Sequence, residues 1–192
     1  MARTKEFDRD LALQRAIQLF SKQGYAATST DDLMQVMGIG RQSMYDTFGD
    51  KRTLFLAALR KYVHSSCGAL LEELKKPGPP LDVIRHALTA FAERKDMVSA
   101  EGCMGLNALS EFGVRDEEVT IIIRSAAASQ RTALRELLHK AVIAGDLSAD
   151  RVDSAADFVD ATLAGIRYAA KAGKSRKALR ELACFAGRAL AG

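Results

Sequence analysis

The chain has 192 residues, of which 48% are hydrophobic and 27% are charged, with a net charge of +4. These fractions are typical of a globular protein with a buried core, so they argue against a wholly disordered chain. The longest stretch without Lys, Arg, Asp or Glu is residues 62–71, about half the length of a membrane-spanning helix, and no apolar run follows the basic start. We therefore expect a cytoplasmic protein that does not enter a membrane.

The spacing of apolar residues is helical along almost the whole chain, and most glycines stand where that spacing lapses. The prolines are confined to Pro77-Gly78-Pro79-Pro80, which predicts one hard break. The segment 120–123 is β-prone but continues a helical pattern. The sequence predicts an all-α fold of about nine helices, near residues 7–23, 29–37, 41–47, 51–75, 81–94, 102–112, 116–144, 151–172 and 175–190.

A helix-turn-helix unit is predicted near the N-terminus, because only Gly38-Ile39-Gly40 separates helix 29–37 from helix 41–47. The first turn of the second of these helices carries Arg41, Gln42 and Ser43, the position from which side chains reach base edges in the major groove. Arg41 suits guanine and Gln42 suits adenine. Residues 1–61 also hold ten basic and seven acidic side chains, and hence most of the net positive charge. We expect double-stranded DNA as the partner.

Several side chains around this unit allow more than one role. Thr47 offers a hydroxyl to phosphate. Thr28 and Ser29 begin a helix, where they either bind phosphate or only cap the helix, and both interpretations stay open. Asp46 either accepts from a cytosine amino group or repels phosphate. Met44 and Phe48 are expected in the core, where they would fix the reading helix.

The N-terminal quarter closely resembles the DNA-binding segment of TetR-family transcriptional repressors. The resemblance covers about residues 8–58 and rests on three stretches: Gly24-Tyr25-Ala26-Ala27-Thr28-Ser29, then Asp32-Leu33-Met34, then Gly38-Ile39-Gly40-Arg41-Gln42-Ser43-Met44-Tyr45-Asp46-Thr47-Phe48-Gly49-Asp50-Lys51. It implies a homodimer on a palindromic operator, a DNA-binding domain at 1–60 and an effector-binding and dimerisation domain at 61–192. It also implies that Tyr45 and Lys51 touch the groove rim or phosphates.

The resemblance further implies that the last two helices pair with their copies in a dimer interface. Both helices carry apolar stripes, with small residues that permit close approach. The alternative is that these stripes close the core of a single subunit. The candidate interface residues are Val159, Leu163, Ile166, Leu179, Leu182 and Ala186.

An unidentified small-molecule effector is expected to bind in a pocket of domain 61–192 that apolar side chains line. For each of these side chains, ordinary core packing is the alternative. The candidates are Phe91, Met97, Met104, Leu109, Phe112, Phe158 and Tyr168. Cys103 opens a predicted helix, where free N–H groups favour a thiolate, and Gly102-Cys103 resembles the opening found in a branch of TetR-type regulators that includes sensors of electrophiles. Cys103 is therefore either a thiol sensor or a packing residue.

Other classes of protein find little support in the sequence. Paired carboxylates, a Ser-His-Asp constellation and a phosphate-binding glycine loop are missing, so we expect no enzyme and no cofactor. The spacing of Cys67, Cys103 and Cys184 suits neither a disulfide framework nor a metal site. A helical adaptor that has lost DNA binding is the alternative function, but such a protein is expected to lose Arg41, Tyr45 and Lys51, which this chain retains.

Overall fold

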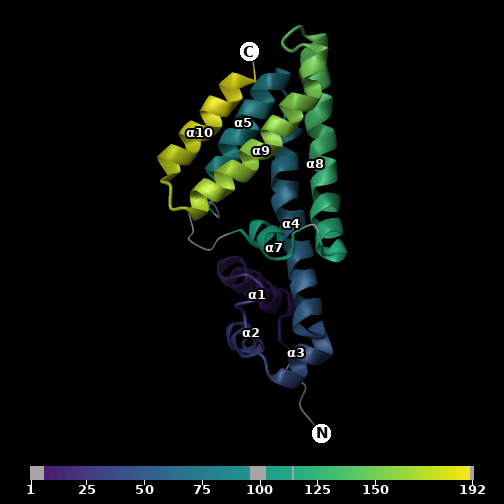
Figure 1. Ribbon diagram of the computed structural model, residues 1–192, viewed down its shortest axis with the longest axis vertical. Coiled ribbons are helices and arrows are strands. Elements are labelled where there is room, and N and C mark those ends of the chain that lie inside the picture. The colour runs from purple at the N-terminus through teal and green to yellow at the C-terminus, as the bar shows by residue number, and fades with distance from the viewer. Residues whose placement is uncertain (1–6, 96–102, 114, 191–192) are drawn as a thin grey trace. The chain divides into compact units, whose positions relative to one another are not determined.

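A computed structural model of the chain describes residues 7–95, 103–113 and 115–190 (Figure 1). Within these ranges the chain is helical, with bounds that differ from the predicted ones by at most two residues. The all-α prediction is confirmed. The described helices are α1 (Arg9–Gln23), α2 (Thr30–Met37), α3 (Arg41–Phe48), α4 (Lys51–Leu74), α5 (Pro80–Ala92), α7 (Met104–Phe112), α8 (Glu117–Ile143), α9 (Val152–Lys171) and α10 (Arg176–Ala189), with a 3-10 turn η1 (Ala149–Arg151) before α9.

Local sequence explains where these helices begin and end. The carboxylate of Asp8 accepts from the N–H of Leu11 at 3.0 Å and caps the start of α1. Pro80 occupies the first turn of α5, where its missing N–H costs no hydrogen bond. At α10, Ser175 caps the helix by accepting from the N–H of Ala178. Ordinary capping therefore sets where these helices begin.

The helices gather into two compact units, each with its own core. The first comprises residues 1–63 and 103–123, and the second comprises residues 64–102 and 124–192. Helices α4 and α8 contribute residues to both units. Helix α7, which the sequence assigned to the effector-binding domain, belongs to the first unit together with α1, α2 and α3.

The core of the first unit consists of large side chains from α1 to α4. Phe20, Leu33, Met44, Leu54 and Phe55 are fully buried. Helix α1 packs against both α2 and α7. The helix-turn-helix unit therefore has a core of its own, to which α7 is attached.

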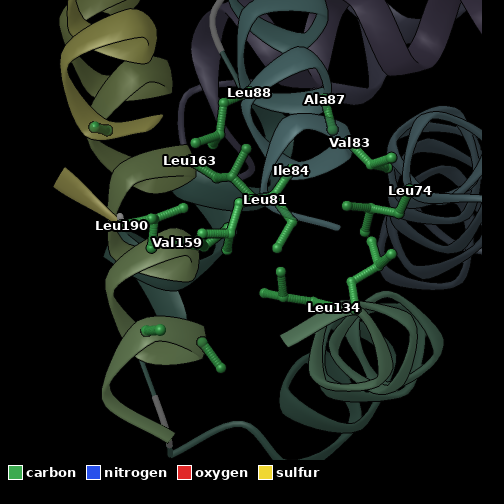
Figure 2. Packing of buried hydrophobic residues seen from close by; sticks show 14 of the residues in the cluster. Leu74, Leu81, Val83, Ile84, Ala87, Leu88, Leu134, Val159, Leu163 and Leu190 are labelled. Carbon is green, nitrogen blue, oxygen red and sulfur yellow. The ribbon is translucent and has the colours of Figure 1, made fainter. Parts of the chain in front are cut away.

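The core of the second unit lies among α5, α9 and α10, with leucines of α4 and α8 completing it (Figure 2). Ile84 and Leu88 of α5 contribute fully buried side chains to it, as does Leu134 of α8. Helix α10 packs on α5 and α9. None of the helices described is both long enough and apolar enough to cross a membrane.

Candidate nucleic-acid interface

The turn between α2 and α3 has the geometry that a helix-turn-helix unit needs. Gly38 ends α2 in the left-handed region, with φ 71° and ψ 32°, and its N–H donates to the carbonyl of Met34 at 3.0 Å. A side chain at Gly38 would be strained at this positive φ. Gly40 then starts α3, whose residue Met44 donates its N–H to the carbonyl of Gly40. The chain thus turns from one short helix into the next over three residues.

Helix α3 is held by its apolar face and presents the opposite face to solvent. Met44 is fully buried and Phe48 is 5% exposed, as the sequence predicts. The ring of Phe48 lies 6.3 Å from that of Phe7 between centroids, and the Arg9 guanidinium carbon lies 5.4 Å from the centre of the Phe48 ring. The rotation of α3 about its axis is fixed by these contacts.

The predicted base-reading side chains lie on the exposed side of α3, and two of them stand beside an acidic residue. Nη2 of Arg41 donates to Oδ1 of Asp31 at 2.9 Å, and Nε2 of Gln42 donates to Oδ1 of Asp46 at 2.8 Å. Ser43 is half-buried. Asp31 and Asp46 thus belong to the site as acceptors. Asp31 and Arg41 are ten positions apart in the sequence, and no local signal indicated their pairing.

The residues predicted at phosphate positions flank this exposed face. Tyr45 is 44% exposed and Thr47 is half-buried. Lys51 begins α4, and its Nζ lies 4.3 Å from the centre of the Tyr25 ring, a cation–π contact. Tyr25 thus controls where the ammonium group of Lys51 stands.

The two hydroxyl residues at the start of α2 act as caps. Thr28 is 1% exposed and donates its hydroxyl to the carbonyl of Gly24 at 2.6 Å. Ser29 forms a capping box with Asp32: its Oγ accepts from the N–H of Asp32 at 3.0 Å, and its own N–H donates to Oδ2 of Asp32 at 3.1 Å. The Ser29 hydroxyl also donates to Oδ2 of Asp32 at 2.6 Å. These contacts favour the capping interpretation, and the hydrogen bonds from Ser29 hold the pKa of Asp32 below its usual value. For Thr28, burial of the hydroxyl and its bond to the Gly24 carbonyl favour capping over a contact with phosphate.

A cluster of opposite charges joins α4 to α8 within the first unit. The guanidinium of Arg52 makes two bonds to Asp116, at 2.8 and 3.0 Å, and one to Glu118 at 2.9 Å. Asp116 also accepts from the N–H of Val119 at 3.1 Å. The bond from Arg52 lowers the pKa of Asp116, while the two carboxylates raise the pKa of Arg52. Sequence reasoning missed this cluster, because its members are 64 to 66 residues apart.

The candidate effector residues are divided between the two units. Met104, Leu109 and Phe112 belong to the first unit, where the ring of Phe112 lies 5.3 Å from that of Tyr25 and 5.4 Å from that of Phe55, between centroids. Phe91, Phe158 and Tyr168 belong to the second. Met97 lies outside the described residues.

Exposure separates these candidates further. Phe91 and Met104 are buried, whereas Leu109, Phe158 and Tyr168 are 44%, 40% and 70% exposed. Exposed side chains cannot enclose a ligand in the interior of a subunit, so the pocket interpretation finds no support at these three positions.

Cys103 stands one position earlier than predicted, as the N-cap of α7 rather than in its first turn. Its Sγ accepts from the N–H of Leu106 at 3.5 Å, and the residue is 6% exposed. The thiol therefore both caps α7 and packs in the first unit. Cys67 and Cys184 are partly exposed, and burial raises the pKa of Cys67.

Most of the residues predicted for the dimer interface are buried inside the subunit instead of lying on its surface. Five of the six, Val159, Leu163, Ile166, Leu179 and Ala186, lie in the buried core of the second unit. The subunit's own packing already covers these five side chains, which favours the alternative that they close the core of a single subunit. Leu182 differs, being 46% exposed, and Phe185 beside it on α10 is 68% exposed.

Comparison with known proteins decides the family. The protein-family model described as "Bacterial regulatory proteins, tetR family" matches residues 12–58. A second family model, "Tetracyclin repressor-like, C-terminal domain", matches residues 80–185. The chain belongs to the TetR family. It is a DNA-binding transcriptional regulator of that family, and the resemblance of residues 8–58 to TetR-family regulators is confirmed.

Relatives match this TetR-family chain over most of its length. An HTH-type transcriptional regulator of Bacillus subtilis, YezE, is 35% identical over 157 residues, 81% of each chain. The transcriptional repressor ComR of Escherichia coli is 26% identical over 94% of this chain and 88% of its own. A structure of the TetR-family regulator CifR, a cysteine mutant complexed with 26-bp double-stranded operator DNA, has a TM-score of 0.81 at 28% identity and covers 97% of this chain and 99% of its own.

Proposed function

We propose that the protein is a homodimeric repressor that binds a palindromic operator through α3 and leaves it when an effector binds. The observation that carries the proposal is the fixed orientation of α3: buried Met44 and Phe48 hold one face, while Arg41 and Gln42 stand exposed at its start. A helix held in this way can enter the major groove with its first turn. The name of the relative ComR, a transcriptional repressor, and the operator-bound structure of CifR support it.

In this proposal the contacts divide into two kinds. Arg41, Gln42 and Ser43 read base edges, and a bidentate contact of this type discriminates against a wrong base by about 1–3 kcal/mol. Tyr45, Thr47 and Lys51 contact the rim and the phosphates, which fix register rather than sequence. The N–H groups at the start of α2 offer a further phosphate position, with Ser29 as their cap.

The dimer forms through the exposed faces of α9 and α10 rather than through their buried stripes. On α10, Leu182 and Phe185 are three residues apart and share a face. On α9, Phe158 and Tyr168 are exposed, with Ala161 and Gly165 between them at helical spacing. A second copy is the occupant, because a single reading helix has too little surface for a stable operator complex, and two related helices read the two halves of a palindrome.

The effector is a small molecule, or a thiol-reactive compound that modifies Cys103. Modification would remove the cap that the Cys103 sulfur provides to the N–H of Leu106 and would add bulk at a buried position. The start of α7 must open to admit a reagent there. A reversible ligand needs no such step.

The test of this function is recovery of bound duplexes from a random DNA pool by the purified protein. We expect enrichment of one palindromic sequence, and release of that duplex by one class of compound in a subsequent screen. Failure to enrich any sequence would favour the helical adaptor over the repressor.

A further inference from the structure

Helix α7 reaches the end of α1 through a carboxylate that binds two consecutive backbone N–H groups. Oε1 of Glu111 accepts from the N–H of Tyr25 at 2.8 Å, and Oε2 accepts from the N–H of Ala26 at 2.7 Å. Hydrogen bonds to an ionised carboxylate are about twice as strong as neutral ones. Glu111 therefore fixes the backbone of the loop that leads from α1 into α2.

Gly24, at the end of α1, leaves room for the carboxylate of Glu111. Gly24 has φ +81°, a conformation that side chains avoid, and a Cβ there would lie 2.0 Å from Oε1 of Glu111. Its N–H still closes α1 by donating to the carbonyl of Phe20 at 2.9 Å. Glycine at this position serves both the turn and the close approach of Glu111.

A second side chain of α7 supports the same end of α1. Asn107 lies one helical turn before Glu111, on the same face. Its Nδ2 donates to the carbonyl of Ser21 at 2.8 Å and approaches the carbonyl of Phe20 at 3.5 Å. The Phe20 carbonyl already accepts from the N–H of Gly24. The Ser21 carbonyl lies in the last turn of α1, where partners within the helix run out, so Asn107 supplies a donor from outside. Asn107 itself is only 8% exposed.

The loop that Glu111 holds includes Tyr25, whose ring contacts the ammonium group of Lys51. The ring of Tyr25 packs at 4.9 Å from Phe55 and 5.3 Å from Phe112, between centroids, and its face lies 4.3 Å from Nζ of Lys51. Backbone and ring of Tyr25 are thus fixed from different sides. A continuous set of interactions runs from Glu111 through Tyr25 to the ammonium group of Lys51.

We propose that Glu111 is a positioning residue for DNA binding, which holds Lys51 where it contacts phosphate. This inference rests on the proposed function, because it takes Lys51 as a phosphate contact. Glu111 itself touches no DNA and acts only through Tyr25. Loss of its carboxylate frees the Tyr25 loop and lets the Lys51 side chain leave its place.

The test measures, by fluorescence anisotropy at several salt concentrations, how tightly the purified full chain binds DNA. One duplex of arbitrary sequence is used throughout. The slope of log K against log salt falls in magnitude by about 0.9 for each phosphate that the protein no longer neutralises. A merely destabilised protein would show fewer active molecules with an unchanged slope. We compare the wild type with Lys51→Ala, Glu111→Ala and the double variant.

We expect both single variants to lose about 0.9 in slope for each subunit bound, and the double variant to lose no more than Lys51→Ala alone. Glu117→Ala is the matched control, because it removes the same charge from an exposed position at the start of α8 in the same unit. Deleting an acid reduces repulsion of DNA, so the control should bind at least as tightly as the wild type. Glu111→Ala should bind more weakly in spite of the same loss of charge.

The outcomes separate the role of Lys51 from that of Glu111. An unchanged slope in Lys51→Ala would remove the phosphate contact and with it the basis for the role of Glu111. A reduced slope in Lys51→Ala together with a wild-type slope in Glu111→Ala would overturn the role of Glu111 alone. Should circular dichroism show Glu111→Ala unfolded, Glu111→Gln keeps an oxygen for one of the two N–H groups. Its slope should lie between those of the wild type and Lys51→Ala, and a wild-type slope there also overturns the role.

Discussion

Arg41, the first residue of α3, donates to the carboxylate of Asp31 on α2 at 2.9 Å, so the side chain proposed to read guanine is paired with an acid in the free protein. Both side chains are well exposed, at 63% and 78%. Exposed pairs of this kind contribute about 0–1 kcal/mol. The pair orients Arg41 and is weak enough for DNA to replace it.

Asp31→Ala should therefore strengthen DNA binding. The variant removes a competing partner and one negative charge, and we expect up to about a fivefold gain in affinity with a change in unfolding free energy below about 1 kcal/mol. Anisotropy titrations and denaturant unfolding measure the two quantities. Weaker binding by Asp31→Ala would mean that the pair persists in the complex and holds Arg41 there.

Asp46 accepts from Gln42 within α3, which gives a test of its role. Asp46→Asn keeps an oxygen for Gln42 and removes the charge, so binding should become tighter with unchanged base preference. Asp46→Ala removes the acceptor as well and should relax the preference for adenine. Base preference is measured on duplexes that carry single substitutions. A changed preference at a cytosine in Asp46→Asn would instead make Asp46 a base-reading residue.

A charged substitution should have different effects on the exposed and the buried faces of α9 and α10. Leu182→Glu and Phe185→Glu alter exposed positions and should give folded monomers with weakened operator binding. Leu163→Glu places a carboxylate in the core of the second unit, where an unpaired charge costs several kcal/mol, and should unfold that unit. Sedimentation and circular dichroism distinguish these results. Intact dimers of both surface variants would put the interface elsewhere.

Asp116 makes the stability of the first unit depend on pH. The bond from Arg52 lowers its pKa in the folded state, so its contribution is complete above the unfolded value of about 3.9 and is lost as pH falls through the lower folded value. Asp116→Asn should lower the melting temperature near pH 7 and differ less from the wild type below about pH 4. Glu117→Gln is the control. An equal difference at both pH values would assign the effect to packing.

Cys103 can be tested by a substitution that keeps its capping role. Cys103→Ser should retain DNA binding, because serine also caps a helix. If the thiol is the sensor, quinone or hypochlorite releases DNA from the wild type and leaves the serine variant bound. The same dose dependence in both proteins would make Cys103 a packing residue.

The sequence predicted those features that depend on neighbours along the chain. Helix ends followed from Gly38 and from the prolines that include Pro80, and the buried face of α3 followed from the spacing of Met44 and Phe48. Each is a local effect of capping or periodicity. Such effects also placed the exposed residues at the start of α3.

Features that depend on distant packing were missed or misread. The bonds that Glu111 accepts from the N–H groups of Tyr25 and Ala26 span 86 and 85 residues, and no local pattern marks them. The apolar stripe with Leu163 was predicted to form a dimer interface, with a subunit core as the alternative, and only packing against α5 and α10 favours the core. The same holds for Thr28, whose hydroxyl turns inward to Gly24.

Parallel selections test most directly whether the first turn of α3 reads bases, on which the proposed function depends. Wild type and Arg41→Ala are each offered the same random pool of duplexes, and the recovered sequences are compared. We expect a palindrome from both, with the variant indifferent at one guanine position in each half-site and weaker by about 1–3 kcal/mol on the wild-type sequence. Identical preferences at every position, with equal loss of affinity on selected and random DNA, would contradict base reading by Arg41.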